Sequence, residues 1–119
     1  MYSPQVLDHF EHPRNSGELP SANATVQLEN PACGDVLKLF AQISDGVIHD
    51  IAFKAKGCVT AIACASAMTE LSKGAHIDEA RQITAEKIAT ALGGLTRETT
   101  HASHLAADAL HELLNTTVA

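Results

Sequence analysis

The chain has 119 residues, of which 45% are hydrophobic and 18% charged, a composition typical of one globular domain rather than a disordered segment. Eight Lys and Arg residues against 14 Asp and Glu residues give a formal net charge of -6, which argues against nucleic-acid binding and against attachment to an anionic membrane. The three cysteines are an odd number in a chain that is not Cys-dense, so we expect no disulfide framework.

A short helix is predicted first, from Pro4 to Glu11. Val6, Leu7 and Phe10 recur at helical spacing, and Pro4 suits the first helical turn. The segment 12–17 (HPRNSG) ends this helix and leads into a loop through Asn23.

Three strands are predicted next, over residues 25–30, 36–43 and 47–55. Asp45-Gly46 between two apolar runs is a strong β-hairpin signal, and the connection 31–35 (PACGD) is also short. We therefore expect a three-stranded antiparallel meander.

The rest of the chain is predicted to be helical. Helices are expected between Gly57 and Gly74, over Ile77–Arg81, over Ala85–Leu92 with Thr84 as its cap, and from near Ser103 onward. The apolar face of the last helix would consist of Leu105, Ala106, Ala109, Leu110, Leu113 and Leu114. The fold class predicted is α+β, as one domain over residues 1–119, with an N-terminal helix and several C-terminal helices packed on the sheet.

No basic segment followed by an apolar run opens the chain, and no stretch is long enough to span a bilayer, so we expect a cytoplasmic protein. Free thiols there act as core residues, metal ligands or nucleophiles.

Antiparallel pairing around the Asp45-Gly46 turn brings Cys33, Asp35 and Cys58 to one end of the sheet. Cys33 lies in a turn, where buried filler is less expected, while Asp35 taken alone could be a turn former. Cys58 would begin a helix, where free N–H groups favour a thiolate.

Other candidate groups have simpler interpretations. Cys64 belongs to the stripe Ala61, Cys64, Met68 and Leu71, which predicts core packing. Most of the seven histidines are expected to be solvated, and His101 and His104 form only a weak metal-binding pair.

Several motifs follow one another along most of the chain. They are residues 6–17 (VLDHFEHPRNSG), 30–35 (NPACGD), 56–58 (KGC) with 61–63 (AIA), and 69–71 (TEL) with 73–74 (KG). In this order, from Tyr2 to about Ala109, the chain resembles the NifU/IscU-type family of iron–sulfur cluster assembly scaffolds.

The resemblance implies that Cys33, Asp35 and Cys58 surround an iron–sulfur cluster or a substituting Zn²⁺. The third family cysteine stands in a His-Cys-Ser segment, which here reads His101-Ala102-Ser103, so that cysteine is absent. The family's histidine can also be a ligand, and His101 supplies it.

Two further departures concern partners. The family's Pro-containing chaperone-binding segment is missing, since residues 95–100 read LTRETT, which argues against docking to the dedicated Hsp70-type chaperone. No long insertion separates Cys58 from His101, which argues against the subtype that holds zinc and accepts sulfur.

The function implied is a scaffold rather than an enzyme. It would build a labile [2Fe–2S] cluster from iron, brought by an iron donor, and from the sulfur of a cysteine desulfurase, and then pass the cluster to apo acceptor proteins. One alternative is a divergent relative with a Zn²⁺ site that binds a desulfurase or accepts sulfur. Another is a thiol enzyme with Cys58 as nucleophile, His101 as base and Asp35 as orienter, although no oxyanion-hole motif is legible.

Overall fold

The computed structural model describes residues 2–31 and 34–116, which form an α+β structure. Its elements in chain order are α1 (Pro4–Glu11), β1 (Ala24–Asn30), β2 (Asp35–Ser44), β3 (Val47–Lys56), α2 (Val59–Ser72), α3 (Ile77–Ala80), α4 (Ala85–Ala91) and α5 (Thr100–Thr116). The predicted fold class is confirmed.

The sheet is an antiparallel meander in the order β1-β2-β3. The turn between β2 and β3 has positive φ at both Asp45 and Gly46, as the two-residue hairpin signal predicts. Residues of β2 alternate between the two faces, and Leu37, Leu39, Ala41 and Ile43 are buried on one of them. This register decides which residues meet at the end of the sheet.

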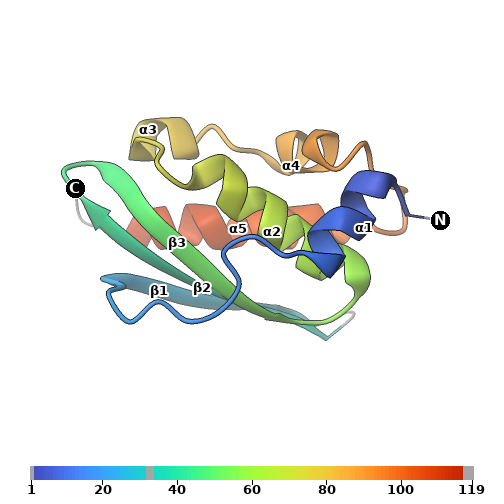
Figure 1. Ribbon diagram of the computed structural model, residues 1–119, viewed down its shortest axis with the longest axis horizontal. Coiled ribbons are helices and arrows are strands. Elements are labelled where there is room, and N and C mark those ends of the chain that lie inside the picture. The colour runs from blue at the N-terminus through green and yellow to red at the C-terminus, as the bar shows by residue number, and fades with distance from the viewer. Residues whose placement is uncertain (1, 32–33, 117–119) are drawn as a thin grey trace.

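The helices lie on one side of the sheet, with α2 and α5 directly against the strands (Figure 1). α1 packs on α2, and α4 packs on both α2 and α5. The core between these layers includes Phe53, Met68, Ile88 and Leu110, each at most 2% exposed. No helix in the described part of the chain is long and apolar enough to cross a membrane.

Two predictions about the helices were wrong in detail. α5 begins at Thr100 rather than near Ser103, so His101 lies within its first turn. Leu71 is 42% exposed, although Ala61, Cys64 and Met68 of the same predicted stripe are buried.

Candidate metal centre

Asp35, the first residue of β2, lies at the middle of the candidate metal centre. Its carboxylate is buried at the end of the sheet, where Val36 pairs with Lys56 of β3. The segment that follows Lys56 therefore passes beside Asp35, as the antiparallel pairing predicted. Asp35 thus lies within reach of the residue that begins α2.

Cys58 is the N-cap of α2, so its Sγ faces the unpaired N–H groups of the first helical turn. The Ala61 N–H donates to this sulfur at 3.4 Å, an arrangement that suits a sulfur carrying negative charge. The Cys58 N–H donates to Asp35 Oδ1 at 3.3 Å, and Sγ lies 3.8 Å from Asp35 Oδ2. Cys58 itself is exposed, so the thiol remains accessible to a partner molecule.

His101 reaches the same carboxylate from α5. Its Nε2 lies 3.6 Å from Asp35 Oδ2, which is too long for a hydrogen bond. This nitrogen is buried and makes no hydrogen bond with any residue in the described ranges 2–31 and 34–116. An orphaned buried nitrogen is uncommon in folded proteins, and a bound ligand would satisfy it.

Asp35, Cys58 and His101 together fit a metal ion. One carboxylate oxygen, one sulfur and one imidazole nitrogen lie within 4.8 Å of one another. These are ligand types that iron and zinc accept. A nucleophilic triad would instead need the imidazole between the thiol and the carboxylate. Here Asp35 Oδ2 lies 3.6 Å from His101 Nε2 and 3.8 Å from Cys58 Sγ, and His101 Nε2 makes no hydrogen bond to the thiol, which favours a metal centre over the thiol enzyme.

Gly57 lies in the segment 56–58 (KGC), for which the sequence predicted no role of the glycine, and the structure shows that it makes room for the Asp35 carboxylate. Its φ is +155°, and a Cβ at this position would collide with the Asp35 carboxylate. The missing side chain therefore lets the backbone approach Asp35 and place the Cys58 N–H on Oδ1. The signal was present as a glycine directly before a candidate ligand.

The remaining candidates differ in their surroundings. Cys33, predicted as a ligand, lies outside the described residues. Cys64 is fully buried in the core, as predicted, and burial raises the pKa of its thiol to about 12. Ala102 is also buried, 1% exposed, at the position where the family cysteine was expected.

His101 also lines a cavity of about 280 Å³ between β1 and α5, whose lining does not include Asp35 or Cys58. The lining residues are Glu29, Asn30, Pro31, His101, His104, Leu105 and Asp108. His104, one turn along α5, is exposed and does not belong to the group of converging ligand atoms. The weak pairing of the two histidines is therefore not needed for the centre.

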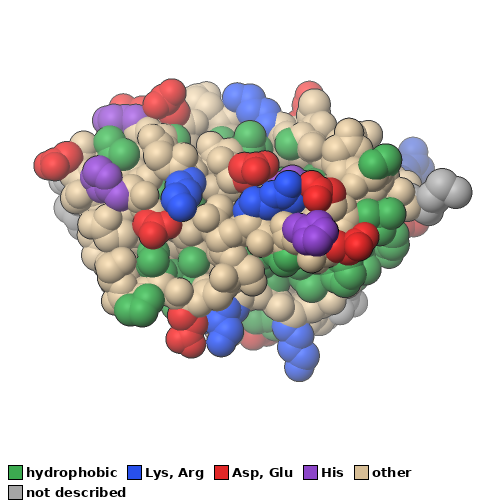
Figure 2. All heavy atoms as spheres, in the orientation of Figure 1, with side chains coloured by type: hydrophobic (Ala, Val, Ile, Leu, Met, Phe, Trp, Pro, Cys, Tyr) green, Lys and Arg blue, Asp and Glu red, His purple; other side chains and the backbone are tan. Residues whose placement is uncertain are grey.

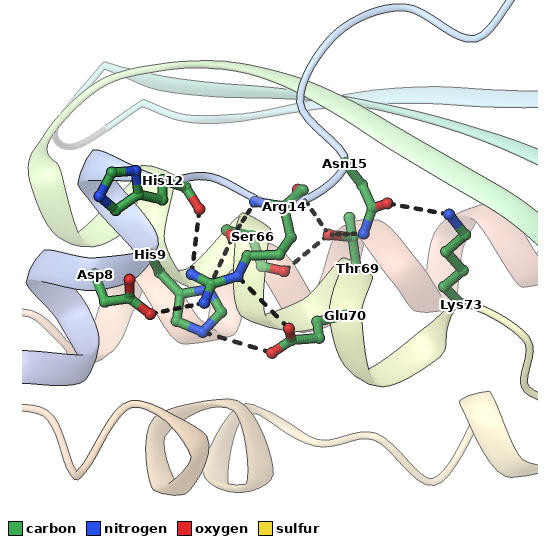
Figure 3. Close-up of polar contacts among 9 residues, drawn as sticks. All are labelled: Asp8, His9, His12, Arg14, Asn15, Ser66, Thr69, Glu70 and Lys73. Carbon is green, nitrogen blue, oxygen red and sulfur yellow. Dashed lines mark hydrogen bonds and ion pairs between the residues drawn. The ribbon is translucent and has the colours of Figure 1, made fainter.

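A second polar cluster joins α1 and the following loop to α2 (Figure 3). His9 is a buried exception among the histidines, of which His12, His49, His76 and His104 are exposed as predicted, and its Nδ1 lies 2.8 Å from Ser66 Oγ. Burial lowers the pKa of His9 below its ordinary value, and the Arg14 guanidinium adds to this effect. On the exposed side, Arg14 donates to Asp8 at 2.7 Å, and this bond holds the Asp8 pKa below its usual range.

This cluster holds the chain together rather than offering a catalytic group. Ser66 is fully buried and already accepts the Arg14 N–H at 2.8 Å, so no substrate can reach its hydroxyl. Glu70, which lies in α2 like Ser66, also belongs to this cluster, with its Oε1 3.7 Å from His9 Nε2. The contacts fix α1 and residues 12–17 on α2.

Comparison with known proteins places these residues in context. Residues 1–116 match the family model described as the NifU-like N terminal domain. The chain is 45% identical, over 114 residues, to the iron-sulfur cluster assembly scaffold protein IscU 1 of Archaeoglobus fulgidus. That match covers 96% of this chain and 74% of the relative.

Two further proteins are similar. The iron-sulfur cluster assembly scaffold protein IscU of Escherichia coli is 43% identical over 113 residues, covering 92% of this chain and 88% of the relative. A crystal structure from Fervidobacterium islandicum is described as a putative scaffold for the SUF system and superposes with a TM-score of 0.78. At 22% identity, over 95% of this chain and 96% of that one, this similarity shows the fold alone.

Proposed function

This chain belongs to the NifU-like N-terminal domain family, and from that premise we propose that it is an iron–sulfur cluster assembly scaffold. The observation that carries the proposal is the convergence of Asp35, Cys58 and the unpaired His101 Nε2 on one point. Relatives at 43% and 45% identity that are named as such scaffolds support it. The cargo would be a labile [2Fe–2S] cluster, or iron on the way to one.

We propose Cys33, Asp35, Cys58 and His101 as the ligands, each with a distinct task. The Cys58 thiolate would bind iron and take up sulfur, since it is exposed and faces the N–H groups of α2. The His101 nitrogen would bind iron through its unpaired Nε2. Asp35 would be a replaceable oxygen ligand, which binds iron less tightly than a thiolate and so eases release. Cys33 rests on the family motif alone.

The partners follow from this role. A sulfur donor, which we propose is a cysteine desulfurase, and apo acceptor proteins must both reach Cys58. An iron donor is a further expected partner, and the LTRETT segment at residues 95–100 argues against the Hsp70-type chaperone. Zn²⁺ would fit the same donors as a substitute. The cytoplasmic location stays a prediction.

The proposal is tested by cluster transfer. The protein is loaded anaerobically with Fe²⁺, cysteine, a desulfurase and a thiol reductant, which supplies the electrons that convert persulfide sulfur to sulfide. Transfer to an apo ferredoxin is then followed by absorption and circular dichroism. Cys58→Ala should lower the transferred amount about tenfold or more, since loss of even an outer ligand contact costs that much in metal binding. Cys64→Ala is the matched control, because its thiol is buried in the core.

Equal transfer by the two variants would contradict the assignment. A wild-type protein that holds zinc and transfers no cluster would support instead the divergent relative that binds a desulfurase or accepts sulfur. We favour the scaffold function over this alternative because both relatives are named as iron–sulfur cluster assembly scaffolds.

A further inference from the structure

Three lysines gather on the solvent face of the sheet, opposite the helices. Lys38 of β2 pairs directly with Lys54 of β3, and Lys56 follows two residues later on the same face. All three are exposed. Lys38 and Lys56 are diagonal neighbours across the two strands, about 7–8 Å apart at the backbone, so the three ammonium groups share one small area. We call these residues the lysine face.

The lysine face contrasts with the rest of the molecule. The chain carries only eight Lys and Arg residues and a net charge of -6. Three of the eight line one shallow hollow of about 260 Å³, together with Glu18, Gln27, Val36 and Ala55. Figure 2 shows basic side chains projecting on the sheet side of the molecule.

Little within the chain neutralises this charge. Lys54 lies 3.5 Å from Glu18, both groups being more than half exposed. Such exposed pairs contribute at most about 1 kcal/mol. Lys38 Nζ lies 5.3 Å from the Phe40 ring centroid, a weak cation–π contact at an exposed site. Lys56 makes no ion pair with any residue of the described ranges.

The arrangement has a cost for folding. Like charges directly opposite on paired strands destabilise a sheet, and Lys38 and Lys54 are such a pair. A local rule broken with only weak compensation in the fold, here one exposed ion pair and one cation–π contact, is typical of a functional surface. The pairing of Lys38 with Lys54 is therefore a reason to expect a negatively charged partner on the lysine face.

The lysine face begins at the candidate centre. Lys56 is two residues before Cys58, and its cross-strand partner Val36 is next to Asp35. A protein seated on the lysine face would therefore lie beside the exposed Cys58 thiol. A charged surface so close to the thiol would bring a partner's own thiols within reach.

We propose that the lysine face is the docking surface for an acidic protein that accepts the cluster, an inference that rests on the proposed function. The overall negative charge repels an acidic protein from most directions, while the lysine face attracts it beside the centre. Hand-over requires rapid binding and rapid release, which charge steering supplies without a large buried area. The occupant is thus an acidic apo iron–sulfur protein.

The test measures binding and transfer separately. Lys38, Lys54 and Lys56 are replaced together by Glu, and the control replaces Lys73, Lys87 and Arg97 by Glu. The two variants change the net charge equally. A third variant replaces the three lysines of the lysine face by Gln, and it tests the same surface if the Glu variant does not fold. Binding of an acidic apo [2Fe–2S] ferredoxin is titrated by fluorescence anisotropy, without any cluster, between 25 and 300 mM NaCl (roughly a threefold range of screening length).

We expect binding at low salt to weaken about tenfold or more in the lysine-face variants, with a flatter salt dependence, and far less in the control. The rate of transfer from loaded protein should fall in parallel, while loading with iron and inorganic sulfide is unchanged. Equal loss in both Glu variants, or loss in neither, would overturn the docking surface. So would competition by inorganic phosphate at constant ionic strength, which would indicate a small-anion site.

Two outcomes separate this inference from the proposed function. If the wild-type protein loads no cluster, the scaffold function fails whatever the binding titration shows. The second outcome is a fall in loading from a desulfurase in the lysine-face variants, with loading from inorganic sulfide and binding of ferredoxin both unchanged. In that case the surface binds the sulfur donor, and the acceptor proposal is wrong.

Discussion

Asp35 is the residue around which the candidate centre is organised. Groups from β2, α2 and α5 meet at its carboxylate, which is 2% exposed. A buried carboxylate is costly unless hydrogen bonds, an opposite charge or a metal compensate it. The Cys58 N–H supplies one hydrogen bond, on Oδ1. A cation held between Oδ2, the sulfur and the imidazole would add an opposite charge beside this carboxylate.

Gly57→Ala tests how far the centre depends on backbone approach. A methyl group at this position would collide with Asp35 and displace the carboxylate. We expect the affinity for Zn²⁺, used as a spectroscopically simple probe in competition with a chelator, to fall about tenfold or more.

Gly17→Ala is the matched control for this variant. Gly17 also has a positive φ, +123°, but no atom lies within 4 Å of its added Cβ. Both variants should lose stability of about 1–3 kcal/mol from backbone strain, and only Gly57→Ala should lose metal affinity. Equal affinities would show that Gly57 does not position Asp35.

His9 provides a prediction about pH. Its folded-state pKa is below the ordinary value of 6.5, chiefly because burial disfavours the charged ring. The surrounding charges are Asp8, Arg14 and Glu70, and His12 stands near Asp8. A depressed pKa means that the fold prefers neutral His9. Its contribution to stability is complete above about pH 6.5 and is lost as the pH falls through the folded-state pKa.

Urea unfolding at pH 7.5 and 5.5 measures this contribution. The wild-type protein should lose more stability on acidification than His9→Gln, which retains a hydrogen-bonding side chain and does not titrate. An identical loss in both proteins would assign the acid sensitivity to other groups.

At the scale of elements, α2 explains why one sequence pattern failed. Most of its residues from Thr60 to Thr69 are buried, because α1, α4, α5 and β3 surround it. A helix covered on several sides has no single apolar stripe, so spacing alone could not assign the faces. In the last turn of α2, Leu71 is exposed while the next residue, Ser72, is fully buried, so the two residues lie on different faces.

A pair of substitutions on α2 checks this description. Met68→Ala empties a fully buried site and should lower the free energy of unfolding by about 2–5 kcal/mol. Leu71→Ala, at a 42% exposed site, should cost less than about 1 kcal/mol. Both are measured by urea denaturation, and similar losses would mean that Leu71 is covered in solution.

The sheet and the caps were predictable because their signals are local. Asp45-Gly46 determines the hairpin, Thr84 caps α4 as expected, and the hairpin places Asp35 beside Cys58. The role of His101 was suggested only by the family resemblance, since α5 is brought to the sheet by tertiary packing. The burial of His9 was not predictable for the same reason, because its partner Ser66 is 57 residues away.

At the scale of the whole molecule, the fold brings an exposed thiol, a buried carboxylate and a half-buried imidazole to one end of a small sheet. β2 and β3 supply the rigid edge, while α2 and α5 each supply a residue from their first turn or N-cap. The cavity beside His101 and the lysine face border this end from two directions. Such an arrangement suits a protein that holds its cargo briefly and shares it with partners.

The measurement that tests this account most directly is the absorption spectrum, with iron and acid-labile sulfide content, of protein purified and reconstituted without oxygen. The wild-type protein and His104→Ala should show the charge-transfer bands of a [2Fe–2S] cluster, since His104 lies one turn along α5 and outside the centre. His101→Ala should retain about a tenth of the cluster or less under the same conditions. Full bands in His101→Ala, or none in the wild-type protein, would contradict the claim that Asp35, Cys58 and His101 hold an iron–sulfur cluster.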